Sequence, residues 1–183
     1  MAPIARFDTI RTDRLVMRRW QDSDKEPFAE LNGDPEIMRF LLSTLDRAAS
    51  DAMIDKIEAR FEEQGFGLWA LEITETGQFI GFAGLNPMPA DVPGGGGMEV
   101  GWRLTSSAWH HGYATEAARS AVDVWFTQLG MPEIYSMTTL LNEPSLAVMR
   151  RLGLTEYARW DHPRIPEGNP LRPSVTYRLV RES

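Results

Sequence analysis

The chain has 183 residues with 43% hydrophobic side chains, which fits one globular domain spanning residues 1–183. No apolar run approaches the roughly 18 residues of a membrane span, and the start lacks a secretory pattern, so we expect a cytoplasmic protein without a membrane partner. The net charge of −7 argues against a nucleic-acid partner, and the absence of cysteine excludes disulfides, thiolate zinc sites and a cysteine nucleophile.

The N-terminal third predicts one strand and two helices. Residues 12–20 favour a strand, and the sequence Asp-Ser-Asp supplies N-cap groups for a helix over 22–33. A short helical turn is expected around 34–36. Apolar residues recur at helical spacing over 48–63, and Gly65 is well placed to end this amphipathic helix.

The middle of the chain predicts three strands. Two β-rich runs, 66–73 and 79–86, flank a turn in which Gly77 supplies the backbone freedom that such turns often need. The sequence PGGGG at 93–97 is expected to be mobile. A further strand follows at 98–104.

The last third predicts two helices and three strands. One apolar face runs along a helix over 114–129, with Gly130 just past its end, and Asn142 caps a shorter helix. The strands are expected at 133–140, 155–160 and 174–180. The order β-α-α-β-β-β-α-β-α-β-β predicts an α/β (α+β) fold with a mixed, largely antiparallel sheet flanked by helices.

The segment SAWHHGYAT at 107–115 joins the strand at 98–104 to the next helix. Backbone N–H groups at a helix N-terminus lack helical partners and lie at the positive end of the dipole, so this loop could cradle a pyrophosphate without a lysine. Gly112 and Ala114 would let phosphates approach the backbone. The simpler alternative is a strand–helix corner that uses Gly only for its geometry. Neither the Walker pattern nor the Rossmann pattern of a phosphate loop is present.

Five stretches, spread over nearly the whole chain, form a specific combination. They are RLVMR at 14–18, EVGWRL at 99–104, WHHGYATEA at 109–117, NEPS at 142–145 and MRRLGL at 149–154. Together they resemble the GNAT N-acetyltransferase superfamily, most closely its RimJ/RimL-like branch. Gly112 and Ala114 match the family's acetyl-CoA loop, Q/R-x-x-G-x-G/A, whereas Trp109 stands where the family has Gln or Arg.

This resemblance implies that the fourth strand, at 98–104, splays away from the fifth, at 133–140, and that the pantetheine arm of acetyl-CoA enters the gap. The pantetheine amides would bind the backbone of Val100, Trp102 and Leu104 in the fourth strand, and the pyrophosphate would lie on the N–H groups of 110–115. Asn142 would contact the pantetheine or cap its helix, and the two roles can coexist. The acetyl-CoA-binding residues so implied are Val100, Gly101, Trp102, Arg103, Leu104, Trp109, His110, His111, Gly112, Tyr113, Ala114, Thr115, Asn142 and Ser145.

Acetyl transfer from a thioester to an amine needs a neutral amine and a stabilised oxyanion. The pKa of a lysine amine is about 10.4 and that of an α-amine about 7.7 to 8.0, so an α-amine of a protein N-terminus or of a small molecule needs less help from a base. Glu99 is the candidate general base, since it begins the strand that would hold the thioester; the alternative is a solvated charge at a strand end. A backbone N–H within 100–102 would meet the oxyanion.

The leaving thiolate also needs a proton donor, which the resemblance assigns. Many GNAT enzymes place a Tyr in the helix after the Asn, but the corresponding residue here is Met149, which cannot donate a proton. The RimL-like branch has a Ser three residues after the Asn, and Ser145 matches it. The alternative for Ser145 is a first-turn residue that bonds its own backbone.

Histidines do not predict a metal site. His110 and His111 are adjacent and point in different directions, so they fit the coenzyme phosphates or the surface better than a metal. His162 belongs to a loop or to the acceptor site, which is expected between 20–42 and 160–171. Aromatic candidates for the acceptor pocket, each of which fits the core more readily, are Trp20, Phe40, Trp69 and Trp160.

Acetyl-CoA is therefore the expected co-substrate, and two alternatives to an enzyme remain. The missing Tyr at Met149 is compatible with a GNAT-fold module that binds acyl-CoA as a regulator without turnover. A coenzyme-free interaction domain would use the Gly112 turn only as a corner. A homodimer is left open, and the resemblance does not separate ribosomal-protein acetylation from small-amine or antibiotic acetylation.

Overall fold

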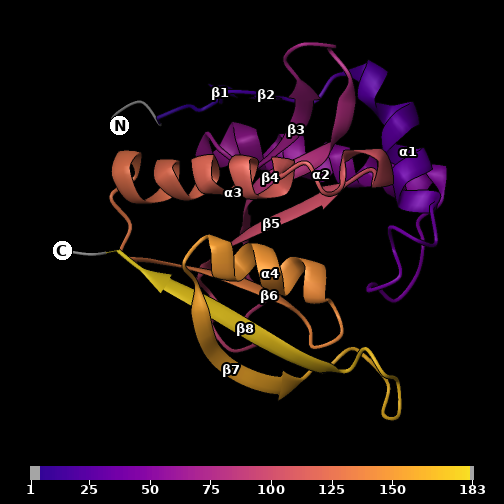
Figure 1. Cartoon of the computed structure of the whole chain (residues 1–183), viewed down its shortest axis with the longest axis vertical. Helices are drawn as coiled ribbons and strands as arrows, with labels where there is room; N and C mark the ends of the chain where they lie inside the picture. The colour runs from indigo at the N-terminus through magenta and orange to yellow at the C-terminus, as the bar shows by residue number, and fades with distance from the viewer. Residues whose placement is uncertain (1–4, 182–183) are drawn as a thin grey trace.

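The computed structural model describes residues 5–181, and its strands are β1 (Thr9–Arg11), β2 (Leu15–Arg18), β3 (Leu68–Ile73), β4 (Phe79–Pro87), β5 (Met98–Leu104), β6 (Glu133–Thr139), β7 (Thr155–Asp161) and β8 (Pro173–Val180). They form an eight-stranded sheet in the order β1-β2-β3-β4-β5-β6-β8-β7 (Figure 1). Every neighbouring pair is antiparallel except β5 and β6. The expected mixed, largely antiparallel sheet is confirmed.

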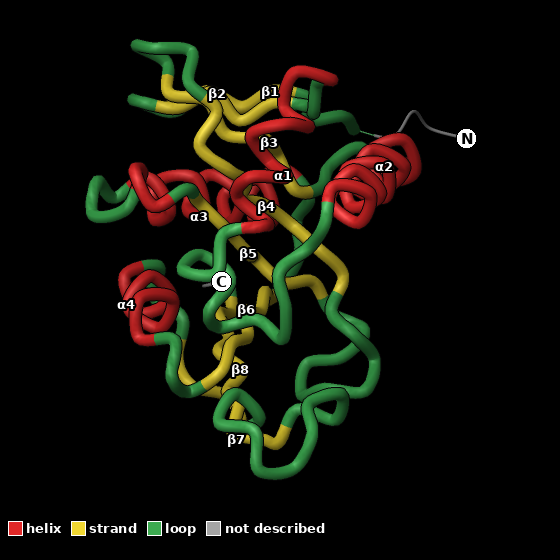
Figure 2. Tube along the Cα trace, turned by 90° about the vertical axis from the view of Figure 1, so that its right-hand side faces the viewer, coloured by secondary structure: helices red, strands yellow, loops and turns green. Residues whose placement is uncertain are grey.

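Helices cover both faces of the sheet. They are α1 (Lys25–Gly33), α2 (Arg47–Gln64), α3 (Tyr113–Asp123) and α4 (Glu143–Arg151), with short segments η1 (Asp22–Asp24), η2 (Ser106–Ala108) and η3 (Val124–Gln128). Figure 2 shows α3 and α4 on one side of the strands and α2 on the other. Gly65 ends α2 with a φ of 80°, as expected. Within residues 5–181, no helix combines the length and apolarity that crossing a bilayer requires.

The strand expected at 12–20 is wrong in its bounds, because the chain turns back within it. Strands β1 and β2 form a hairpin whose turn is closed by Thr12: its N–H donates to the Leu15 carbonyl at 3.0 Å, and its Oγ1 accepts from the Leu15 N–H at 2.9 Å. The Thr12 hydroxyl accepts from a backbone N–H three residues later, which makes this turn without Gly or Pro. The sheet therefore has one more strand than the sequence predicts.

The helix expected over 114–129 changes its pitch near its end. Leu129 N–H donates to the Val124 carbonyl at 3.0 Å, a π-type bond that marks η3. Trp125 lies in this segment and is buried, and its Nε1 donates to the Glu133 carbonyl at 2.7 Å. Gly130 follows with a φ of 68°, as predicted.

The sheet opens between β5 and β6. These two strands share one paired position, Glu99 with Tyr135, whereas β5 pairs with β4 along the whole length of β5. The splay expected between the fourth and fifth predicted strands is thus present, and the extra N-terminal strand makes them the fifth and sixth. Figure 1 shows β6, β7 and β8 with α4 below this opening, and β1 to β5 above it.

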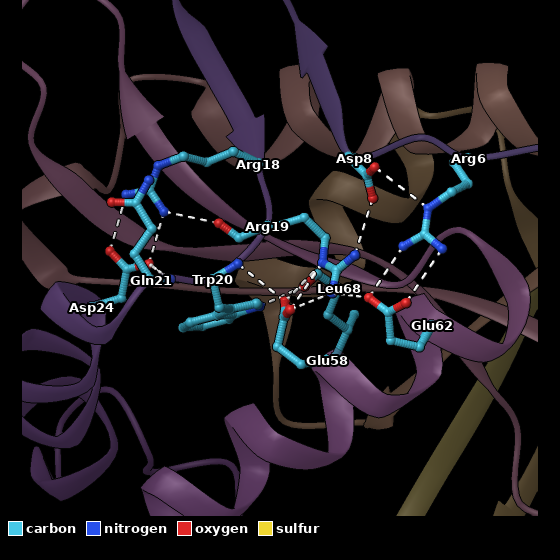
Figure 3. A network of polar contacts seen from close by, with 10 residues as sticks. All are labelled: Arg6, Asp8, Arg18, Arg19, Trp20, Gln21, Asp24, Glu58, Glu62 and Leu68. Carbon is cyan, nitrogen blue, oxygen red and sulfur yellow. Dashed lines mark hydrogen bonds and ion pairs between the residues drawn. The ribbon is translucent and has the colours of Figure 1, made fainter.

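A network of charged side chains ties β2 to α2 (Figure 3). Arg19 Nη2 bonds Glu62 Oε1 at 2.8 Å, and its Nε bonds Glu58 Oε2 at 2.9 Å. Asp8 adds a contact to Arg19 Nη1 at 3.1 Å. Next to this network, Trp20 Nε1 donates to the Leu68 carbonyl at 2.8 Å, which fixes that indole in the core.

Candidate active site

The opening between β5 and β6 is part of a cleft of about 1730 Å³. It runs from the N-terminal turn of α3 to the loop between α1 and α2. The predicted site residues that line it are Glu99, Val100, Gly101, Trp102, Arg103, Leu104, Trp109, His110, Gly112, Tyr113, Ala114, Thr115, Asn142 and Ser145. Among the predicted catalytic and acetyl-CoA-binding residues, only His111 does not line the cleft.

The hydrogen-bonding pattern of β4 and β5 determines which way the β5 backbone points. Thr105 N–H donates to the Ile80 carbonyl at 2.9 Å, so odd-numbered positions of β5 bond β4. The even-numbered positions, Val100, Trp102 and Leu104, therefore direct their N–H and C=O groups toward β6. Beyond the single pair at Glu99, no strand in 5–181 bonds this edge. These are the three residues whose backbone was expected to bind the pantetheine amides.

The loop before α3 presents a row of backbone donors. His110 and Gly112 have φ angles of 65° and 81°, and Gly112 is the N-cap of α3. The N–H groups of 110–115 donate no hydrogen bond to any acceptor among residues 5–181. Such a left-handed turn leading into a helix is an anion-binding arrangement. Trp109 Nε1 anchors the loop to the Leu104 carbonyl at 3.1 Å.

Arg14 and Glu116 brace this loop from the β1–β2 turn. Arg14 Nη1 donates to the His111 carbonyl at 2.9 Å, and its guanidinium lies 4.7 Å from the Tyr113 ring centroid. Glu116 pairs with Arg14 Nη2 at 2.6 Å and accepts from Thr12 Oγ1 at 2.6 Å. Burial raises the pKa of Glu116, but these hydrogen bonds outweigh it and lower that pKa overall. His111 thus contributes its carbonyl to the brace, and its ring stacks on Tyr113.

Glu99 faces the cleft beside β4. Burial raises the pKa of Glu99 from its ordinary 4.5 to about 7, although a hydrogen bond from Asn86 and the charge of Arg60 both lower it. Asn86 Nδ2 donates to Glu99 Oε1 at 2.9 Å, and Arg60 donates in turn to the Asn86 side-chain oxygen. A carboxylate with a pKa near neutrality is suited to accept and release a proton at physiological pH.

Asn142 and Ser145 begin α4 on the other side of the gap. Asn142 Oδ1 accepts from the Ser145 N–H at 3.3 Å, so Asn142 is the helix N-cap, and its Nδ2 donates to Thr138 Oγ1 at 3.0 Å. The Ser145 hydroxyl has no hydrogen-bond partner within 5–181 and lies in the cleft. Met149 is 1% exposed and belongs to the core, so it offers no polar group to the reaction.

The four aromatic candidates divide between the cleft and the core. Phe40 lines the cleft, whereas Trp20 and Trp69 are buried in the main core. Trp160 packs on a second apolar cluster and stands 5.3 Å from His162, which lies outside the cleft. Within residues 5–181, no group of three or more His, Asp or Glu side chains is arranged to hold a metal ion.

The sequence does not single out three residues in or beside the cleft: Asn86 and Arg39, which line it, and Arg60, which bonds Asn86. Asn86 sits opposite Glu99 on β4, a position that the register of the hairpin could have indicated. Arg60 comes from α2 and no local pattern marks it. Arg39 stacks over the rings of Phe40 and Trp109, at 4.7 and 5.0 Å from their centroids.

Comparison with known proteins gives a consistent result. A family model described as an acetyltransferase (GNAT) domain matches residues 14–155. An FsC-acetyl coenzyme A-N(2)-transacetylase from Aspergillus fumigatus is 30% identical over 187 aligned positions, which cover 95% of this chain and 77% of that protein.

Solved structures share the same fold. An acetyltransferase from Agrobacterium tumefaciens is 27% identical, superposes with a TM-score of 0.77 and matches 94% of each chain. A RimL ribosomal L7/L12 α-N-protein acetyltransferase, solved with coenzyme A, has the same TM-score of 0.77 at 12% identity and covers 94% of this chain and 97% of its own. At that identity the likeness concerns the fold alone.

Proposed function

Because the chain belongs to the GNAT acetyltransferase family, we propose that it transfers the acetyl group of acetyl-CoA to a primary amine, namely an α-amine of a protein N-terminus or of a small molecule. One observation carries this proposal: a loop of free N–H groups, an unpaired strand edge and a carboxylate with a pKa of about 7 share one cleft. The Aspergillus relative is named as an acetyl coenzyme A transacetylase, which supports acetyl-CoA as the donor.

The chain's residues fit acetyl-CoA in two places. The N–H groups of 110–115 would bind its pyrophosphate, and the β6-facing backbone of β5 would bind its pantetheine amides. Acetyl-CoA itself supplies an activated thioester. His111 would act through the Arg14 brace, since its carbonyl fixes the loop.

Glu99 then accepts the proton that the amine loses, and Ser145 stabilises the leaving thiolate by a hydrogen bond. As the amine nitrogen bonds to the thioester carbonyl carbon, Glu99 accepts the proton that the nitrogen loses, directly or through a water. The carbon–sulfur bond breaks, and Ser145 donates a hydrogen bond to the departing sulfur. Both side chains line the cleft from opposite sides of the gap, Glu99 on β5 and Ser145 on α4.

Thermal melting with acetyl-CoA tests the coenzyme site. Ligand at about 100 times its Kd should add about 2.7 kcal/mol of stability, which raises Tm by roughly 5 to 10 °C for a chain of this size. Free CoA should also raise Tm and ATP should not. A thiol reagent then reports CoA release without background, because the chain has no cysteine.

One other function has a specific observation in its favour. The core residue Met149 occupies the place where many relatives have a proton-donating Tyr, so the protein could instead bind acyl-CoA as a regulatory module. That function predicts a rise in Tm with acetyl-CoA and no thiol release with any amine. Amine-dependent release would exclude it.

A further inference from the structure

Arg103 is a partly buried cation without an ionic partner among residues 5–181. Its Nη1 donates to Asn32 Oδ1 at 2.5 Å, and its guanidinium lies 5.3 Å from the ring centroid of Phe82. No carboxylate of residues 5–181 lies within ion-pair distance of Arg103. Burial lowers its pKa to about 10, and no anion offsets this effect. A desolvated guanidinium with unused donors is a strong site for a carboxylate.

Arg103 shares one face of β5 with the proposed base. Side chains alternate along a strand, so Glu99, Gly101 and Arg103 point the same way. Asn32 belongs to α1 and Arg60, which bonds Asn86 beside Glu99, belongs to α2, so this is the face covered by those helices. The coenzyme loop lies at the start of α3, on the opposite face.

The space between the two charged residues is open. A Cβ at Gly101 would have no atom within 4 Å, so the strand offers a gap between Glu99 and Arg103. Residues four apart in a strand are separated by ~13 Å between Cα atoms. Apolar side chains from the α1–α2 region, Ile37, Phe40 and Met53, complete this part of the cleft.

We propose that this face binds an amine acceptor that also carries a carboxylate, with the amine beside Glu99 and the carboxylate on Arg103. The proposal rests on the proposed function and specifies its substrate class. The carboxylate has two sources: the terminal carboxylate of a small amino acid or peptide, or an acidic side chain near a protein N-terminus. Arg103 acts here as a residue that determines specificity, while Glu99 keeps its role with the nitrogen.

Paired acceptors test this proposal. In the first series, alanine, Ala-Gly and Ala-Gly-Gly are each compared with their own C-terminal amide. The α-amine is the same in all of them, amidation removes the carboxylate, and each added glycine moves the carboxylate further from the amine. In the second series, the amidated peptide Ala-Glu-Ala, which carries its carboxylate on a side chain, is compared with amidated Ala-Gln-Ala, which is neutral at that position. Affinity is measured by calorimetry on CoA-saturated protein, and kcat and KM by thiol release.

The expected result is that at least one acid binds about 10- to 100-fold more tightly than its amide, as a forked charge-assisted contact provides. R103Q should remove that preference, with the loss appearing in KM for the acids, whereas K56Q, which neutralises an exposed lysine, should keep it. If R103Q does not fold, R103K provides the test. A lysine has a single ammonium in place of the forked guanidinium, so the ratio of the affinities for acid and amide should fall about tenfold.

Three outcomes overturn the proposal: equal affinity for every acid and its amide, no binding of either, or an unchanged preference in R103Q or R103K. None of these depends on turnover. Failure of the proposed function is distinct, because it appears as CoA binding with no thiol release from any amine.

Discussion

Asn86 donates a hydrogen bond from Nδ2 to Glu99 Oε1 at 2.9 Å while its own side-chain oxygen accepts one from Arg60. This chain of contacts sets the state of the proposed base. Burial disfavours the charged carboxylate and raises the pKa of Glu99, whereas the hydrogen bond from Asn86 and the positive charge of Arg60 lower it. The net result is a pKa of about 7. Three elements, β4, β5 and α2, cooperate to produce it.

Replacing Glu99 should alter the pH dependence as well as the rate. In the wild type, kcat/KM should rise with pH through a midpoint near 7, because only the ionised Glu99 accepts a proton. Glu99→Gln should lower kcat/KM about 100- to 1000-fold and remove that midpoint. Initial rates of thiol release across pH 5.5 to 9 measure both effects, with the exposed Glu63→Gln as the control.

The stability of the same variant gives a check that needs no substrate. The pKa of Glu99 is raised in the folded state, so between pH 4.5 and 7 the folded protein holds a proton that the unfolded chain has lost. The contribution of Glu99 to wild-type stability therefore falls as pH rises through this window, by up to about 3 kcal/mol. The Tm of Glu99→Gln, relative to that of the wild type, should therefore rise as the pH increases from 4.5 to 7. If plots of Tm against pH are parallel for the two proteins, Glu99 is an ordinary carboxylate.

Removing the partners of Glu99 should move its titration upward. Asn86→Ala deletes a hydrogen bond that lowers the pKa of Glu99, and Arg60→Met deletes a favourable charge. The midpoint of the kcat/KM profile should rise in both variants, with a larger shift for Asn86→Ala because its contact is direct. Unchanged midpoints in both would mean that the base is another group.

A feature of this site could be predicted where its residues are neighbours in the sequence, and could not where it depends on how distant elements pack. The N–H cradle at 110–115 was predictable because it consists of backbone groups placed by a strand–loop–helix order. The link from Arg60 to Glu99 was not, because it depends on where α2 docks on the sheet, and no local spacing encodes that position.

Two local features of the fold were missed for a different reason. The β1–β2 turn is made by the Thr12 hydroxyl, so the usual Gly and Pro turn signals are absent. The π turn at 124–128 inserts one residue into a helix, which an apolar pattern of limited length cannot distinguish from continued α-helix.

Ser145 and Asn142 should affect different properties. Ser145→Ala keeps the backbone N–H that Asn142 caps, so its Tm should be unchanged while kcat falls about 10- to 100-fold through the loss of the thiolate's donor. Asn142→Ala removes the cap and should cost about 1 kcal/mol of stability. Melting curves and thiol-release rates separate the two. Full kcat in Ser145→Ala would remove that residue from the mechanism.

Arg14 should control coenzyme affinity from outside the contact site. Arg14→Ala breaks the bond to the His111 carbonyl and the ion pair with Glu116, so the loop must be ordered when acetyl-CoA binds. We expect Kd for acetyl-CoA to rise about 5- to 10-fold by calorimetry, in keeping with one or two lost ordering contacts. Arg11→Ala, which removes an exposed arginine from the same hairpin, is the matched control. Equal Kd values in the two variants would show that the loop is ordered without the brace.

The Arg19 network should be worth more than any exposed ion pair of this protein. The side chain of Arg19 is 23% exposed and that of Glu58 is 29% exposed, so Arg19→Met leaves partly desolvated carboxylates without a cation. The cost should be about 1 to 3 kcal/mol, less than for a fully buried pair because water still reaches these groups. Arg47→Met breaks a pair with Asp51 whose arginine is 57% exposed, and its cost should stay below about 0.5 kcal/mol. Urea unfolding measures both, and a cycle that adds Glu58→Gln isolates the coupling between Arg19 and Glu58. A coupling near zero would mean that Arg19 stabilises the fold by packing its stem on Phe61, over which its guanidinium lies at 4.9 Å from the ring centroid.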